Sequence, residues 1–96
     1  MRDYIFTTEA ETTLESYVDY LLDQHAYGAA QEIRTYIELF IVRTLCLFPA
    51  MGRHIESKEI WETWIPGTRV VLWYRFDHEN VTIITLWHTA QDRPLQ

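Results

Sequence analysis

The spacing of the apolar residues changes once along this chain, near Pro49 and Gly52, and this change limits the possible folds more than any other feature. Before it, apolar residues recur with the period of an amphipathic helix, about 3.6 residues. After it, they lie in short segments rich in Trp, Ile, Val and Thr, which is typical of strands. Pro and Gly are suited to end a helix and turn the chain. The sequence therefore predicts helices first and a sheet second.

The part before the change is predicted to contain one strand and two helices. Residues 2–7 are rich in aromatic and β-branched side chains, which favours a strand. Thr8 is the predicted N-cap of the first helix, because Glu11 follows it at the spacing of a capping box. The apolar stripe of this helix continues to Leu22, and the second helix is predicted over residues 29–48. A short turn between them would make an antiparallel helical hairpin.

Three strands are predicted after the change, over residues 57–65, 69–76 and 81–88. The last one is expected to alternate strictly, with Val81, Ile83, Thr85 and Trp87 on one face. The predicted fold class is α+β, in the order β-α-α-β-β-β. Its helical hairpin would pack on one face of a small, twisted and mainly antiparallel sheet. Residues 1–96 are predicted to form a single domain in which residues 89–96 are a polar tail.

Charge and composition exclude several classes of protein. The 96 residues carry eight basic and fourteen acidic side chains, a net charge of −6, so direct binding of duplex DNA is not expected. Residues 1–48 hold three basic and eight acidic side chains, whereas residues 49–96 hold five and six, so any anion site is expected in the second half. No signal peptide and no membrane span are predicted. With Cys46 as the only cysteine, the cytoplasm is the expected location.

No cofactor or metal is predicted either. The four histidines, His25, His54, His78 and His88, show no metal-ligand spacing. The sequence also lacks a glycine-rich phosphate loop and a nucleophile elbow.

Several motifs resemble those of the RelE/ParE toxins of bacterial type II toxin–antitoxin systems. The link from helix to sheet at residues 47–53 is similar to that family's L-x-x-x-P-x-x-G-R. Residues 67–76 resemble its arginine-then-tyrosine strand, and residues 81–92 its terminal strand and tail. The order of the predicted elements also matches. The resemblance is nearer to ParE than to RelE, because lysines are almost absent and the chain is acidic.

A ParE-like chain is implied to be a toxin that acts by protein contact, with DNA gyrase as the implied target, and that a cognate antitoxin neutralises. The residues assigned to target contact are Arg53, Arg75, Gln91 and Arg93. An excess of apolar side chains over the needs of one small core predicts an antitoxin groove. The residues assigned to it are Leu39, Val42, Trp61, Trp64 and Trp73.

Two alternatives remain open at the level of sequence. A RelE-like chain would be an enzyme that cleaves ribosome-bound mRNA without a metal, using a base, an acid and cations around the phosphate. His88, Arg69 and His54 are the residues assigned to that chemistry. The second alternative is a non-toxic family member that acts as an interaction module.

Overall fold

The computed structural model describes residues 1–89. The elements, in chain order, are β1 (Asp3–Phe6), α1 (Thr8–Asp23), α2 (Tyr27–Phe40), a π-helical turn (Ile41–Leu45), a 3-10 turn (Pro49–Met51), β2 (Arg53–Ile55), a second 3-10 turn (Glu56–Lys58), β3 (Ile60–Trp64), β4 (Val70–Phe76) and β5 (Asn80–His88).

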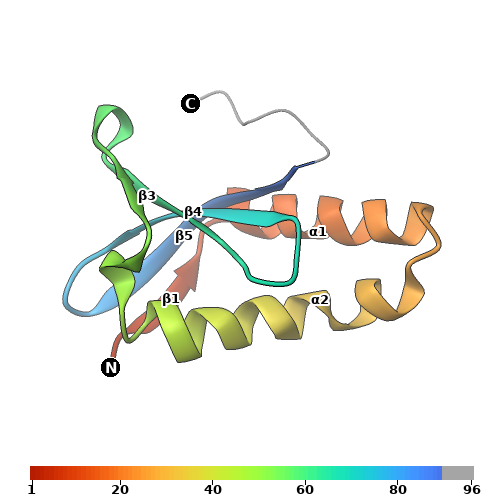
Figure 1. Cartoon of the computed structure of the whole chain (residues 1–96), viewed down its shortest axis with the longest axis horizontal. Coiled ribbons are helices and arrows are strands. Elements are labelled where there is room, and N and C mark those ends of the chain that lie inside the picture. The colour runs from red at the N-terminus through yellow and green to blue at the C-terminus, as the bar shows by residue number, and fades with distance from the viewer. Residues whose placement is uncertain (90–96) are drawn as a thin grey trace.

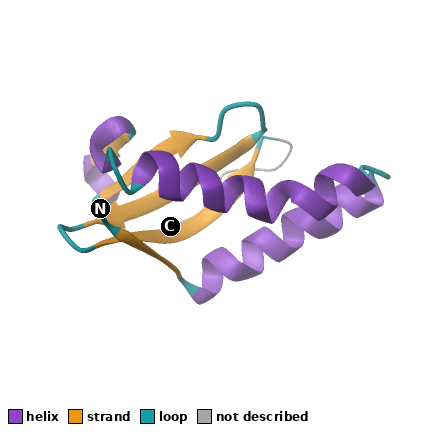
Figure 2. Cartoon of the chain, turned by 90° about the horizontal axis from the view of Figure 1, so that it is seen from below, coloured by secondary structure: helices purple, strands orange, loops and turns teal. Residues whose placement is uncertain are grey.

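The five strands form one mixed sheet in the order β1-β5-β4-β3-β2 (Figure 1). β1 is parallel to β5, and every other neighbouring pair is antiparallel. α1 and α2 form a hairpin on one face of this sheet (Figure 2). The predicted α+β class is confirmed, with a larger sheet than expected.

The extra strand is β2, which the sequence analysis missed. It has only three residues, Arg53–Ile55, too few to show a period of two. Its neighbour β3 begins at Ile60 rather than at residue 57, because residues 56–58 form a 3-10 turn that ends in Glu59 with a positive φ of 54°.

The helix boundaries also differ from the prediction. Thr7, not Thr8, is the N-cap of α1, and its Oγ1 accepts a hydrogen bond from the Ala10 N–H at 3.0 Å. The second helix is regular only to Phe40 and then widens into the π-helical turn, where the Cys46 N–H bonds to the Ile41 carbonyl at 2.8 Å. The apolar stripe continues across this turn, so periodicity alone could not reveal it.

β5 contains a bulge that overturns the predicted strict alternation. Trp73 of β4 pairs with Thr85 and Tyr74 pairs with Ile83, so Ile84 is an extra residue. After it the faces exchange: Leu86 joins Ile83 in the core beneath the helices, whereas Trp87 belongs to the cluster on the opposite face.

Two threonines of the first helical region stabilise this bulge. The Thr7 hydroxyl donates to the Ile84 carbonyl at 2.7 Å, and the Leu86 N–H donates to Thr13 Oγ1 at 3.2 Å. β1 ends at Phe6, so beyond it these side chains take the place of a neighbouring strand. The backbone groups of the bulge are thereby kept hydrogen-bonded inside the molecule.

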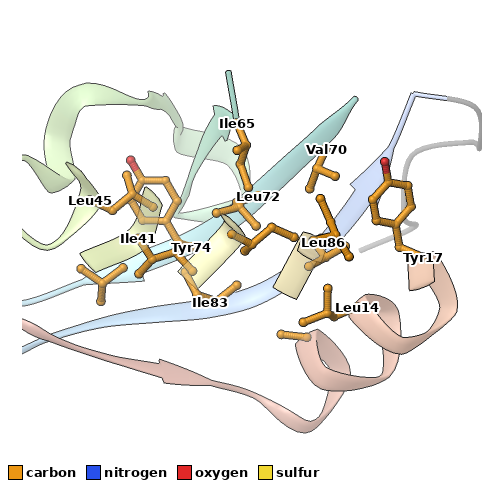
Figure 3. Packing of buried hydrophobic residues seen from close by; sticks show 14 of the residues in the cluster. Leu14, Tyr17, Ile41, Leu45, Ile65, Val70, Leu72, Tyr74, Ile83 and Leu86 are labelled. Atoms are coloured by element: carbon orange, nitrogen blue, oxygen red, sulfur yellow. The ribbon is translucent and has the colours of Figure 1, made fainter. Parts of the chain in front are cut away.

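The main core lies between the helices and the sheet (Figure 3). Side chains from both layers point toward one another there, and the following are fully buried: Leu14, Ile37, Ile41, Leu45, Leu72, Tyr74, Ile83 and Leu86. A smaller cluster of Ile60, Val71, Trp73 and Trp87 lies on the other side of the sheet, called the outer face below.

Candidate functional site

The link between the helices and the sheet is held by Tyr74. Its hydroxyl lies in the core and donates to the Pro49 carbonyl at 2.6 Å. Burial raises the pKa of Tyr74 to about 12, so the phenol remains a donor at neutral pH. A Cβ on Gly52 would lie 2.5 Å from the Tyr74 hydroxyl oxygen and 2.6 Å from the Glu62 carbonyl oxygen. The Pro-x-x-Gly motif thus has a structural role, which is to bring the chain against the sheet just before Arg53.

A buried carboxylate organises the outer face next to this link. Glu62 is buried in β3 and accepts a hydrogen bond from the Trp73 indole N–H at 2.7 Å and one from Arg53 Nη2 at 2.9 Å. Arg53 is otherwise exposed. The Arg53 guanidinium is therefore fixed on the outer face by a charged hydrogen bond that includes a buried partner.

Arg75 lies on the same face. It follows Trp73 by two residues in β4, so both project from the same side. Its Nε donates to the Glu59 carbonyl at 3.3 Å, and the rest of the side chain is exposed. The structure therefore brings Arg53 and Arg75, two of the four predicted target contacts, to one face. The other two, Gln91 and Arg93, lie outside the described residues.

The residues predicted for RNA cleavage are not all brought together. His88 is only 7% exposed, and its ring lies 5.0 Å from the Tyr17 ring and 4.5 Å from the Tyr20 ring. Burial lowers the pKa of His88. Arg69 lies near the end of β5 that carries His88, because its carbonyl accepts the Thr89 N–H at 3.0 Å. Its side chain is exposed.

His54 lies at the far edge of the sheet, on β2, where its ring stacks on Trp61 at 4.8 Å. β2 is three strands away from β5, and the pairing registers place His54 four residues further along than His88. The three strand spacings (about 14 Å) and the four-residue offset (about 13 Å) together place the two residues roughly 19 Å apart. An acid and a base that act on one phosphate must each reach it by a hydrogen bond, so His54 and His88 cannot both act on the same phosphate.

The five residues predicted to bind an antitoxin do not form one patch. Trp73 was expected on the surface, but it is 1% exposed because its indole packs in the outer cluster and bonds to Glu62. Trp61 is half-buried against the main core, whereas Trp64 is 55% exposed at the end of β3. Leu39 and Val42 belong to the helix layer, Leu39 to α2 and Val42 to the π-helical turn, and Leu39 is 41% exposed.

A set of hollows along α2, centred on Tyr36, was not predicted from the sequence. Three adjoining hollows of about 310, 330 and 220 Å³ share this side chain, and Leu39 lines two of them. The Tyr36 hydroxyl donates to the Pro66 carbonyl at 2.6 Å, which ties α2 to the turn between β3 and β4. Tyr36 belongs to the apolar stripe of the second helix, so the spacing predicted a core residue. In the structure its side chain is 46% exposed. These hollows are called the α2 groove below.

Within residues 1–89, no cluster of three or more His, Cys, Asp or Glu side chains is arranged to hold a metal ion. No helix in that range has the length and apolar character needed to cross a membrane. Cys46 is buried, and burial raises the pKa of its thiol.

Comparison with known proteins agrees with this fold. Residues 4–93 match the family model described as the ParE toxin of the type II toxin–antitoxin system, parDE, so the chain belongs to the ParE toxin family. A solved chain of the chromosomal ParDE system from P. aeruginosa has a similar structure, with a TM-score of 0.68 and 15% identity over 92% of this chain and 96% of that one. No curated protein sequence matches the chain.

Proposed function

We propose that this ParE-family toxin arrests growth in the cytoplasm by binding a protein target with its outer face, and that a cognate antitoxin neutralises it by occupying the α2 groove. DNA gyrase is the first target to test, because the resemblance to ParE implies it. The observation that carries the proposal is the position of the candidate side chains. Arg53 and Arg75 are exposed side chains on one face of the sheet, whereas the two histidines assigned to RNA cleavage lie far apart.

The α2 groove supports binding of an antitoxin segment. Exposed aromatic and aliphatic surface at Tyr36 and Leu39 lies beside the carboxylate of Glu32 and the guanidinium of Arg43. An apolar groove of this kind suits a segment that folds on binding and inserts apolar side chains. Because residues 1–48 are strongly acidic, we expect the inserted segment to carry basic residues as well.

Expression in bacterial cells tests the toxin and its target together. Induction of this chain alone should stop growth, and co-expression of the product of the neighbouring small reading frame should restore it. DNA breaks linked to gyrase, together with mRNA that primer extension shows to be intact, are expected. Cleaved mRNA with intact DNA would instead favour the RelE-like enzyme. Normal growth on induction would contradict the toxin.

A further inference from the structure

The outer face contains a hollow that is lined by two basic side chains. It has a volume of about 280 Å³ and lies beside the 3-10 turn at residues 56–58. It is lined by Ser57, Lys58, Ile60, Trp73, Arg75 and Ile84. Two of the eight basic residues of the chain are in this list, and no carboxylate among the described residues lines the hollow.

The apolar part of the hollow is well supported. Ile60 and Trp73 are 4% and 1% exposed, and Ile84 packs against the same cluster. The Trp73 indole is fixed from below by its hydrogen bond to Glu62. Lys58 Nζ lies 5.9 Å from the centre of the Trp73 ring, within reach of a cation–π interaction.

One hydrogen bond to the backbone fixes the position of the Arg75 side chain. Its Nε donates to the carbonyl of Glu59, whose left-handed backbone conformation places that carbonyl at the entrance to β3. A guanidinium has five N–H donors, and four of them are on the two Nη atoms. Within residues 1–89, no hydrogen bond or ion pair engages the Nη atoms of Arg75, whose side chain is exposed.

We propose that this hollow binds a glutamate or aspartate side chain from an exposed acidic segment of the target protein. The carboxylate would accept hydrogen bonds from Arg75 and Ser57 near the charge of Lys58, and its aliphatic stem would contact Ile60 and Ile84. This inference adds the chemistry of one contact to the proposed function and depends on that function only for the identity of the partner.

A nucleic acid is the less favoured ligand for two reasons. The net charge of −6 repels a polyanion over a longer range than two cations attract it. The Trp73 ring is already approached by Lys58, so the hollow offers no open aromatic face on which a base could stack. A single carboxylate can be held by one guanidinium, which Arg75 supplies.

Binding of short peptides to the intact, isotope-labelled chain tests this site directly. The probe is acetyl-Ala-Glu-Glu-Ala-amide, and the matched control peptide has Gln in place of both Glu residues. Saturable NMR shifts are expected at the Trp73 indole N–H and the Arg75 amide with the Glu peptide only. The affinity should fall as salt is added, because the contact is electrostatic. Equal binding of the Gln peptide, or shifts confined to the α2 groove, would overturn the proposal.

Variants separate a specific site from general attraction between charges. Arg75→Gln should weaken binding of the Glu peptide about tenfold, whereas Arg75→Lys should retain most of it. Arg43→Gln removes an exposed cation from the π-helical turn, away from the hollow, and should leave the affinity unchanged. A loss with Arg43→Gln equal to that with Arg75→Gln would overturn the site. If Arg75→Gln fails to fold, Ser57→Ala, which removes the other proposed hydrogen-bond donor, should also weaken binding of the Glu peptide.

Two further probes test the other ligand class. Inorganic phosphate and a short oligouridine should cause weaker shifts at Trp73 than the Glu peptide, and stronger shifts from either would contradict an acidic protein ligand. The result is independent of toxicity. If the chain binds the peptide but does not stop growth, the binding site is supported and the proposed toxin function is contradicted. If the chain stops growth but does not bind the peptide, the toxin function is supported and the binding site is contradicted.

Discussion

At the scale of single residues, Gly52 shows how closely the link between the helices approaches the sheet. The atoms that a Cβ on Gly52 would meet are the Tyr74 hydroxyl oxygen and the Glu62 backbone carbonyl. Both groups are held in place, Tyr74 by its hydrogen bond to Pro49 and Glu62 by strand pairing. Neither atom can move away at little cost, because Tyr74 is fully buried and Glu62 is part of the β3 ladder. The glycine in this motif is therefore required by packing.

Gly52→Ala should lower the free energy of unfolding by about 1–3 kcal/mol, the usual cost of forcing extra atoms into a packed region. Urea denaturation measures the change. Gly28→Ala is the matched control, because a Cβ there meets nothing within 4 Å and Gly28 lies in the first turn of α2. This control should be neutral or slightly stabilising, by up to about 1 kcal/mol. Equal destabilisation by both changes would contradict the packing argument.

His88 makes stability depend on pH through its burial against Tyr17 and Tyr20. The pKa of His88 is below its ordinary value of 6.5 in the folded chain, so the unfolded chain takes up a proton first as the pH falls. Stability should therefore decrease as the pH drops through 6.5 toward the lower folded value, and His88 should contribute no pH dependence above that range.

Thermal unfolding between pH 8 and pH 5 measures this effect. His88→Phe should flatten the pH dependence in this range while keeping an aromatic ring in the stack. His78→Gln serves as the control, because His78 is almost fully exposed in the loop before β5, and it should leave the slope unchanged. A slope that persists in His88→Phe would show that other groups cause it.

At the scale of elements, α2 contributes to both the core and the α2 groove. Its buried side contributes Ile33 and Ile37 to the core, and Tyr36 and Leu39 on its solvent-facing side line the groove. The hydrogen bond from Tyr36 to Pro66 fixes the groove against the β3–β4 turn. The groove is thus a property of two elements that are about thirty residues apart in the sequence.

Leu39→Ala should weaken binding of the cognate antitoxin about tenfold or more, because burying a leucine side chain contributes about 1.5–3 kcal/mol. Isothermal titration with the purified antitoxin measures it. Leu22→Ala is the matched control: Leu22 is a leucine of similar exposure on α1 and does not line the groove. An equal loss in both variants would place the antitoxin elsewhere.

At the scale of the whole molecule, β5 is the strand on which the other parts depend. It pairs with β1 on one side and β4 on the other, and α1 packs along it. β2 is the opposite case, a three-residue edge strand with exposed Arg53 and His54. The outer face therefore joins the most stable part of the sheet to its least stable edge.

Native-state hydrogen exchange should reveal this difference. Amides of β4 and β5 should be the slowest to exchange, with protection close to the global free energy of unfolding, whereas those of β2 should exchange through local opening. The antitoxin should leave β2 unprotected if it occupies only the α2 groove. Protection of β2 equal to that of β5 in the isolated chain would contradict this description.

Much of this fold could be predicted from the sequence, since the change of period near Pro49 separates helices from strands and each pattern is local. The assignment to the RelE/ParE toxins, nearer ParE, followed from motif order and is confirmed by the family match. Local pattern could not reveal β2 or the bulge at Ile84, because both are defined by pairing with distant strands.

The candidate site depended even more on tertiary structure. Arg53 and Arg75 were predicted to contact a target, but only packing decided that Trp73 is buried and that His54 and His88 lie apart. Packing also decided that Lys58 and Arg75 line one hollow. The physical reason is one of range. Hydrophobic period and capping act within a few residues, whereas burial and the meeting of charges depend on which strands lie side by side.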